Sequence, residues 1–180
     1  MEKLYDTDYF YKMLRLYSQT AEDICERRWD FIEEGFGITA DGLTVLDYGS
    51  GCGFFKAFAP AGALVDTFDL MPVPQTGITR EHYDLLTFWD VLEHVPNLMD
   101  LKPIFDKADR FVAVTVPIKP DGLAWEKYKH FKPGEHIHHF QHDYLQAVMR
   151  LFGFELVLSG TPECPPREMI GSFLFRRVSK

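Results

Sequence analysis

The sequence is short of the features that mark secreted and membrane-spanning proteins. Its 180 residues hold only three cysteines, widely spaced and without a Cys-x-x-Cys pair, which argues against a disulfide framework and favours a reducing compartment. No apolar run approaches the ~20 residues that span a bilayer, and the first residues form neither the basic nor the apolar region of a signal peptide. We therefore expect a cytoplasmic protein with no membrane partner.

Positive charge is also scarce. Lys and Arg together number 19 against 27 Asp and Glu residues, for a net charge of −8. Nucleic-acid binding relies on clustered basic side chains, so this balance disfavours a nucleic-acid partner. Residues 125–132 interleave basic and aromatic side chains, a pattern that suits either base stacking or a pocket for an acidic or aromatic small molecule. The overall acidity favours the small molecule.

The sequence does have the composition of a packed globular chain, with 46% hydrophobic residues. It shows no repeat, low-complexity tract or linker, so we expect a single domain over residues 1–180, as a monomer or homodimer. Apolar spacing over residues 8–34 predicts two helices, the second stopped by Gly35 and Gly37. Residues 1–36 then form either a packing layer or a helical lid over a pocket.

Short apolar runs alternate with helical patterns along the rest of the chain. This alternation predicts an α/β fold with a mostly parallel sheet, closed by an antiparallel C-terminal hairpin at the sheet edge. The expected strands cover residues 43–46, 63–68, 83–89, 111–116, 154–158 and 169–178. The expected helices cover residues 54–58, 98–107 and 143–152.

One stretch between the first strand and the short helix after it suits close approach of a ligand: Asp47-Tyr48-Gly49-Ser50-Gly51-Cys52-Gly53. Glycine lacks Cβ, so a ligand can lie against the main chain, and a helix that follows directs free N–H groups toward it. Asp47 would repel a pyrophosphate and attract an amine-bearing ligand. Phe54 stands where a dinucleotide fingerprint has its third glycine, which makes a nicotinamide oxidoreductase the least favoured function.

Two further stretches that follow strands are expected beside this loop. Asp69 ends the second strand, and its carboxylate can accept two hydrogen bonds from a ribose diol. Residues 90–94 follow the strand 83–89. Because ligands of open α/β sheets bind at the carboxyl ends of the strands, all three loops should line one crevice.

These motifs resemble those of class I S-adenosylmethionine-dependent methyltransferases. Residues 47–53 are similar to that family's D-x-G-x-G-x-G signature, and Asp69 matches its acid at the end of the second strand. Residues 83–96 and the His138-His139-Phe140 segment, followed by a helix and a Gly-Phe pair, look like its small-molecule, ubiquinone-pathway-like branch. The resemblance covers about residues 40–160 and implies a Rossmann-like sheet.

The resemblance implies an enzyme that moves a methyl group from S-adenosyl-L-methionine (SAM) to an O or N atom of a small molecule. The implied cofactor-binding residues are Asp47, Gly49, Gly51, Gly53, Asp69, Leu70, Met71, Phe88, Trp89 and Asp90. The glycine backbone would hold the methionine part, Asp47 would orient the loop and face the amino group, and Asp69 would bind the ribose. Leu70 and Met71 would sandwich the adenine, and residues 88–90 would contact the methionine end and the substrate. Residues 118–141 would form a substrate-side insertion.

One segment departs from the family pattern. Only 13 residues separate Asp69 from Tyr83, where the family fits a helix, a further strand and an acid that reads the adenine amino group. Residues 75–82 can supply at most a minimal strand, so we name no adenine-edge acid, and the sheet can be reduced around the family's third strand. One alternative function is therefore a non-catalytic SAM- or nucleoside-binding module. An RNA or protein methyltransferase, based on residues 125–132, is another.

Histidines are the candidates for acid–base chemistry. Transfer from a sulfonium needs mainly proximity and alignment, but an O or N acceptor can need a general base with a pKa near 7, which suits histidine. His138 and His139, then His94, are the candidate catalytic residues. The alternative for each of these histidines is a structural role, in which it stabilises the conformation of the loop that carries it.

A metal site is the third role considered for these histidines. His136 and His138 would point the same way on a strand and could share a cation with Glu93 or Glu135. Their spacing matches no known metal pattern, however, and we assign no metal ligands from the sequence.

Overall fold

The computed structural model describes residues 7–37, 39–71, 73–165 and 167–178. Its six strands are β1 Thr44–Tyr48, β2 Leu64–Phe68, β3 Tyr83–Trp89, β4 Ala108–Pro117, β5 Phe154–Gly160 and β6 Ile170–Arg177. Its α-helices are α1 Thr7–Tyr17, α2 Ala21–Phe36, α3 Phe54–Ala57, α4 Lys102–Phe105 and α5 His142–Leu151. Three 3-10 turns cover Leu92–His94, Leu98–Leu101 and Trp125–Lys127.

The strands form one sheet in the order β2-β1-β3-β4-β6-β5. The first four are parallel, so that Val45 of β1 lies between Val65 and Leu85, while β6 runs antiparallel to both β4 and β5. Strand β3 is a nearly unbroken apolar run because helices cover both of its faces. The predicted α/β class and C-terminal hairpin are confirmed, although only β5 of that hairpin lies at the sheet edge.

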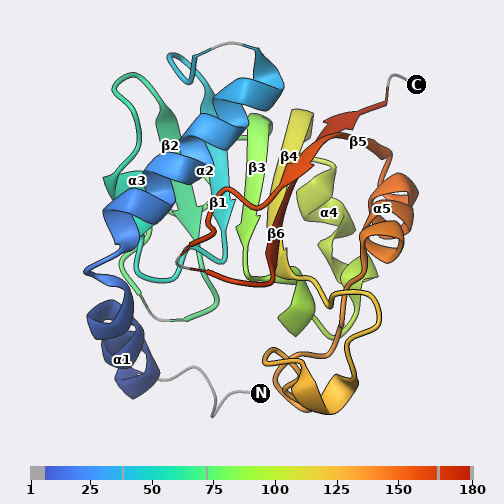
Figure 1. The fold of residues 1–180 in the computed structure, drawn as a ribbon. Coiled ribbons are helices and arrows are strands. Elements are labelled where there is room, and N and C mark those ends of the chain that lie inside the picture. Colours follow the sequence, from blue (N-terminus) through green and yellow to red (C-terminus); the bar gives the residue numbers. More distant parts are fainter. Residues whose placement is uncertain (1–6, 38, 72, 166, 179–180) are drawn as a thin grey trace.

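Two hydrophobic cores lie on the two faces of the sheet. On one face α2 crosses the strands diagonally (Figure 1), and Trp29 and Ile32 of α2 pack with Phe55 of α3. On the other face Phe105 of α4 packs with Met149 of α5 and with the strands between them. The domain is therefore a three-layer α/β/α sandwich.

The N-terminal helices follow the expectation except at their glycines. Gly35 lies inside α2, where a Cβ would overlap Leu174 Cδ2 of β6, so it permits close helix–sheet packing and does not stop the helix. Gly37 ends the helix in the left-handed conformation, with its N–H donating to Glu33 O. Helix α1 and the segment after β4 lie at the same, lower edge of the molecule (Figure 1). Residues 1–6 of the expected lid fall outside the described chain.

The expected helix 98–107 is broken into a 3-10 turn and the four-residue α4. Pro103 explains the break because it lacks an N–H and is tolerated only in the first turn of a helix. Over the ranges given above, no helix is both long and apolar enough to cross a membrane.

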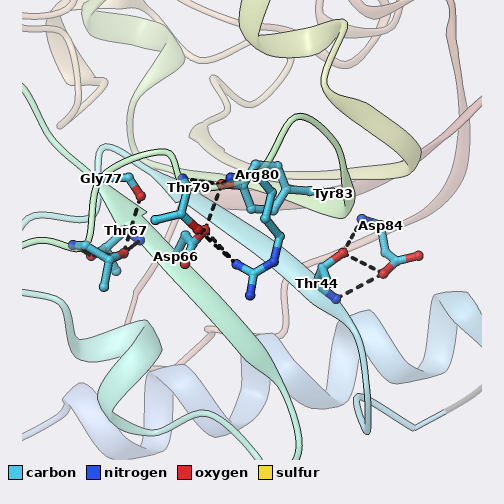
Figure 2. Close-up of polar contacts among 9 residues, drawn as sticks. Thr44, Asp66, Thr67, Gly77, Thr79, Arg80, Tyr83 and Asp84 are labelled. Carbon is cyan, nitrogen blue, oxygen red and sulfur yellow. Dashed lines mark hydrogen bonds and ion pairs between the residues drawn. The ribbon is translucent and has the colours of Figure 1, made fainter.

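The crossover from β2 to β3, residues 69–82, contains no strand among its described residues. It runs beside β2, where Thr76 Oγ1 accepts Thr67 N–H at 2.7 Å, Thr67 Oγ1 accepts Thr76 N–H at 3.0 Å, and Gly77 N–H donates to Thr67 O at 3.0 Å. Nearer its end, the crossover is bonded to Asp66 of β2, which accepts hydrogen bonds from Thr79, Arg80 and Tyr83 (Figure 2). The sheet is thus reduced at this edge, as the short segment indicated.

Burial alone would raise the pKa of Asp66, but hydrogen bonds from Thr79, Tyr83 and Arg80 outweigh burial and hold that pKa below its ordinary value. A charged Asp66 with three donors therefore anchors the crossover where a further strand is missing.

Candidate active site

The glycine loop is folded against the end of β2. Gly49 N–H and Ser50 N–H both donate to Phe68 O, at 2.7 and 3.1 Å. Gly49 has φ +77°, and a Cβ there would overlap Val91 Cγ2, so the loop after β3 packs too closely for any other residue. At Gly51, φ is +52° and a Cβ would meet no atom of the described chain within 4 Å. One side of Gly51 is therefore open to a ligand.

Asp69 is joined directly to this loop. Its Oδ2 accepts Gly51 N–H and its Oδ1 accepts Met71 N–H, both at 2.7 Å. The Gln75 side chain fixes the Asp69 backbone, accepting its N–H at 2.8 Å and donating to its carbonyl at 3.0 Å. A carboxylate offers about four acceptor positions, so two remain on the half-buried Asp69.

Asp47 lies beneath the loop and is 1% exposed. Its Oδ1 accepts the Thr87 hydroxyl at 2.8 Å, whereas no polar group in the described part of the chain bonds its Oδ2. Burial raises the pKa of Asp47 to about 7, against the lowering effects of the Thr87 hydrogen bond and of Arg28. This carboxyl is therefore an acceptor with one unsatisfied oxygen.

Asp90, after β3, belongs to a partly buried ion network. Its Oδ2 lies 2.8 Å from Arg167 Nη1 and 3.6 Å from Arg28 Nη2. The wholly buried Glu163 side chain pairs with the same two arginines, at 2.7 Å from Arg28 Nε and 2.6 Å from Arg167 Nη1. These contacts connect α2, the loop after β3 and the loop between β5 and β6.

The network holds its charges in place. Burial alone would raise the pKa of Asp90, but Arg167 and then Arg28 outweigh burial and keep that pKa below its ordinary value. Burial would lower the pKa of Arg167, and its pairing with Asp90 and Glu163 raises that pKa instead. Asp90 and Arg167 therefore each stabilise the charged form of the other.

The candidate catalytic histidines make different contacts. His94 Nδ1 lies 2.9 Å from Glu135 O, and His138 Nε2 lies 2.9 Å from Val95 O, with the Tyr144 hydroxyl 3.4 Å from its Nδ1. His139 packs edge-on against Trp125, at 5.4 Å between ring centroids. Within the described ranges its buried Nε2 has no hydrogen-bond partner, and burial lowers its pKa.

A family model of the methyltransferase domain matches residues 16–159. The chain belongs to the methyltransferase-domain family. A comparison with curated protein sequences finds no match.

Solved methyltransferases have the same fold. Magnesium protoporphyrin IX methyltransferase from Synechocystis PCC 6803, with bound S-adenosylhomocysteine (SAH), is 19% identical with a TM-score of 0.69, and the match covers 96% of each chain. The Burkholderia thailandensis 1,6-didemethyltoxoflavin-N1-methyltransferase, with its substrate and SAH bound, is 14% identical with a TM-score of 0.65, and the match covers 96% of this chain and 85% of that one. CalO1, a methyltransferase in calicheamicin biosynthesis in its SAH-bound form, is 15% identical with a TM-score of 0.61 over 95% and 59% of the two chains.

Within this methyltransferase fold, the loop residues and Asp69 come together as the sequence indicated. Met71 is half-buried and Leu70 is 87% exposed next to them. Trp89 is almost buried under Arg28, whose guanidinium lies 4.6 Å from the Trp89 ring centroid. Phe88 departs from the expectation, because its side chain is fully buried among core aromatic rings and does not line a crevice.

Three residues of the ion network, Arg28, Glu163 and Arg167, were not singled out by sequence reasoning. Arg28 has the spacing of an ordinary exposed helix residue, and Glu163 lies in a proline-rich loop whose position the sequence does not define. Their only sequence signal is that Arg28 precedes Trp29, a core residue of α2.

Proposed function

We propose that this protein is an enzyme that methylates an O or N atom of a small molecule with SAM as the methyl donor. The observation that carries the proposal is the contact of Asp69 with the glycine loop, in which Oδ2 accepts Gly51 N–H at 2.7 Å. The acid and the loop thereby form one preorganised surface. Bound SAM would supply a methyl group already activated on a sulfonium, so the protein needs mainly to align donor and acceptor.

Two features of the site suit an amino-acid-bearing nucleoside. The two acceptor positions left on Asp69 equal in number the two hydroxyls of a ribose diol. The unpartnered Oδ2 of Asp47, as far as the described residues show, suits an amine donor, directly or through a water molecule. The open side of Gly51 lets such a ligand lie against the backbone.

Where the methyl acceptor needs a catalytic base, we assign that role to His139. Its low pKa keeps the imidazole neutral near pH 7, and a neutral ring can accept a proton. The nitrogens of His138 are engaged with Val95 O and with Tyr144. This distinction ranks His139 before His138 as the base.

Titration calorimetry with SAM and SAH tests the cofactor assignment. Gly51→Val should abolish binding, because the side chain would occupy the open side of the loop. Gly37→Val is the matched control: Gly37 also has positive φ, with no described atom within 4 Å of an added Cβ, but it ends α2. Both variants carry the same backbone strain, so only Gly51→Val should lose binding.

Absence of heat from folded wild-type protein at millimolar SAH would refute the proposal, and equal loss in both variants would remove Gly51 from the site. Transfer of labelled methyl to any of a panel of small phenols, acids and amines then tests turnover. Cofactor binding with no product across the panel, including with nucleic-acid and protein acceptors, would favour the non-catalytic module.

A further inference from the structure

A cluster of possible metal ligands lies next to Asp90, where two distant segments meet. One ligand atom from each of Glu93, His94 and His136 lies within 4.8 Å of the others. Glu93 and His94 come from the 3-10 turn after β3, and His136 comes from the segment between β4 and α5. The two segments are already joined, since Ile137 N–H and His138 N–H both donate to Glu93 O, at 2.7 and 3.1 Å.

Backbone carbonyls orient both imidazoles. His94 Nδ1 lies 2.9 Å from Glu135 O, and His136 Nδ1 lies 2.9 Å from His130 O. A carbonyl oxygen only accepts, so each Nδ1 carries the proton and each Nε2 carries a lone pair. Metal-binding histidines usually have this arrangement, in which the second ring nitrogen donates to a carbonyl or carboxylate.

Glu93 supplies the observation that points to a cation. Its side chain is 2% exposed, and its Oε2 has no hydrogen-bond partner anywhere in residues 7–37, 39–71, 73–165 and 167–178. Its Oε1 lies 4.0 Å from His94 Nε2. A buried carboxylate oxygen without a donor is costly, and a bound cation removes that cost.

We propose that Glu93, His94 and His136 bind one divalent transition-metal ion, with zinc as the best match. Two imidazole nitrogens and a carboxylate oxygen are a ligand set that zinc uses in sites with an open fourth position. Bonds of ~2.1 Å in a tetrahedron place ligand atoms about 3.4 Å apart. The 4.0 Å between Glu93 Oε1 and His94 Nε2 therefore needs a contraction of about 0.6 Å, and a pair at the 4.8 Å limit of the cluster needs about 1.4 Å.

A water molecule or Glu135 would supply the fourth ligand of the ion. Glu135 Oε1 lies 3.9 Å from His136 Nε2, but it is also paired with Lys132 Nζ at 3.1 Å. Calcium and magnesium fit less well because they prefer oxygen ligands. The ion would fasten the segment that carries His136 to the loop that carries Asp90, beside the glycine loop.

The test is zinc binding to chelator-treated protein, followed by competition with a chromophoric chelator. Wild type should bind one Zn²⁺ per chain, and Co²⁺ in its place should give the visible absorption of a tetrahedral site. Glu93→Gln and His136→Asn should each weaken zinc binding at least about a hundredfold, the upper end of what outer-shell changes cost. SAH titration of the same samples reports the cofactor site separately, so either assignment can fail alone.

His82→Asn is the matched control. His82 also lies beside carboxylates, at 3.1 Å from Asp109 and 4.0 Å from Glu81, but half of its side chain is exposed. It should leave zinc affinity unchanged. A wild-type Kd weaker than about 0.1 mM, equal affinity in Glu93→Gln, or loss only in His82→Asn would overturn the proposal.

Thermal melting covers the case in which His136→Asn does not fold. Zinc should raise the melting temperature of wild type and of His82→Asn, because a ligand that binds the folded state stabilises it. It should not raise that of Glu93→Gln, which keeps the size of the side chain. An equal shift in Glu93→Gln contradicts the site.

Discussion

Replacing Asp69 with alanine removes the acceptor shared by the glycine loop and the proposed ribose site. The carboxylate now accepts Gly51 N–H and Met71 N–H, both at 2.7 Å. Its other two acceptor positions are the ones assigned to the ribose hydroxyls. Asp69→Ala should therefore weaken cofactor binding and loosen the loop at the same time.

The size of the effect follows from these bonds. A hydrogen bond to a charged group contributes about 1.5–3 kcal/mol, and we take the lower end because Asp69 is only half-buried. Two ribose bonds then amount to about 3 kcal/mol, which is about a 150-fold increase in the Kd of SAH. The loss of the two backbone bonds should lower stability by about 1–3 kcal/mol, since the freed N–H groups can reach water.

Asp84→Ala is the control for this prediction. The Asp84 carboxylate also accepts two hydrogen bonds, from the Thr44 N–H at 3.0 Å and from the Thr44 hydroxyl at 2.7 Å (Figure 2). These bonds lie at the amino end of β1, at the opposite end of the strand from the glycine loop. Calorimetry with SAH and urea unfolding should show similar stability losses in both variants and weaker binding only in Asp69→Ala. Wild-type affinity in Asp69→Ala, or the same affinity loss in Asp84→Ala, would refute the assigned ribose site.

Three further predictions concern stability. Because burial raises the pKa of Asp47 to about 7, the folded state favours its protonated form, and the stability that this residue contributes should fall as pH rises from about 4 to about 7. Urea unfolding should therefore show that Asp47→Asn gains more over wild type at about pH 8 than at about pH 5, and an equal gain at both would show an ordinary pKa. Glu163→Ala leaves the largely buried guanidinium groups of Arg28 and Arg167 short of a partner and should cost about 3–5 kcal/mol, whereas Asp106→Ala, in an exposed pair with a lysine 2.6 Å away, should cost less than about 1 kcal/mol. Similar losses in the two variants would mean that water reaches the network. Gly35→Ala should destabilise by about 1–3 kcal/mol despite its better helix propensity, because the new Cβ overlaps the buried Leu174, and a gain in stability would show that this leucine moves aside.

The fold was predictable because the spacing of apolar residues along the sequence indicates which side chains are buried. Strand β3 was predicted with its observed limits, since seven residues that are covered on both faces read as one apolar run. The limits of α2 were predicted less well. Gly35 looks like a stop signal in the sequence, but tertiary packing against Leu174 decides its role. A helix propensity cannot include a contact with a strand that lies well over a hundred residues further along the chain.

The candidate site was predictable only where its residues directly follow strands of the sheet. The loop 47–53 and Asp69 follow strands that pair, so their meeting could be inferred from the α/β pattern. The network of Arg28, Glu163 and Arg167 could not, because it joins a helix to a distant hairpin loop through side chains alone. The same holds for His136, whose ring packs edge-on against that of His94 at 4.9 Å between centroids.

The short crossover bears on whether the cofactor site is complete. Loss of a strand next to β2 would leave an edge with unpaired backbone groups and Asp69 without support. Side chains of the crossover and one of its backbone N–H groups make the hydrogen bonds that this strand would have made. Thr76 and Gly77 satisfy the edge at Thr67, and Gln75 bonds both the N–H and the carbonyl of Asp69. The acid assigned to the ribose is therefore bonded at both of its backbone polar groups despite the missing strand, and we expect the shortening to affect the side of the site that would receive the adenine edge.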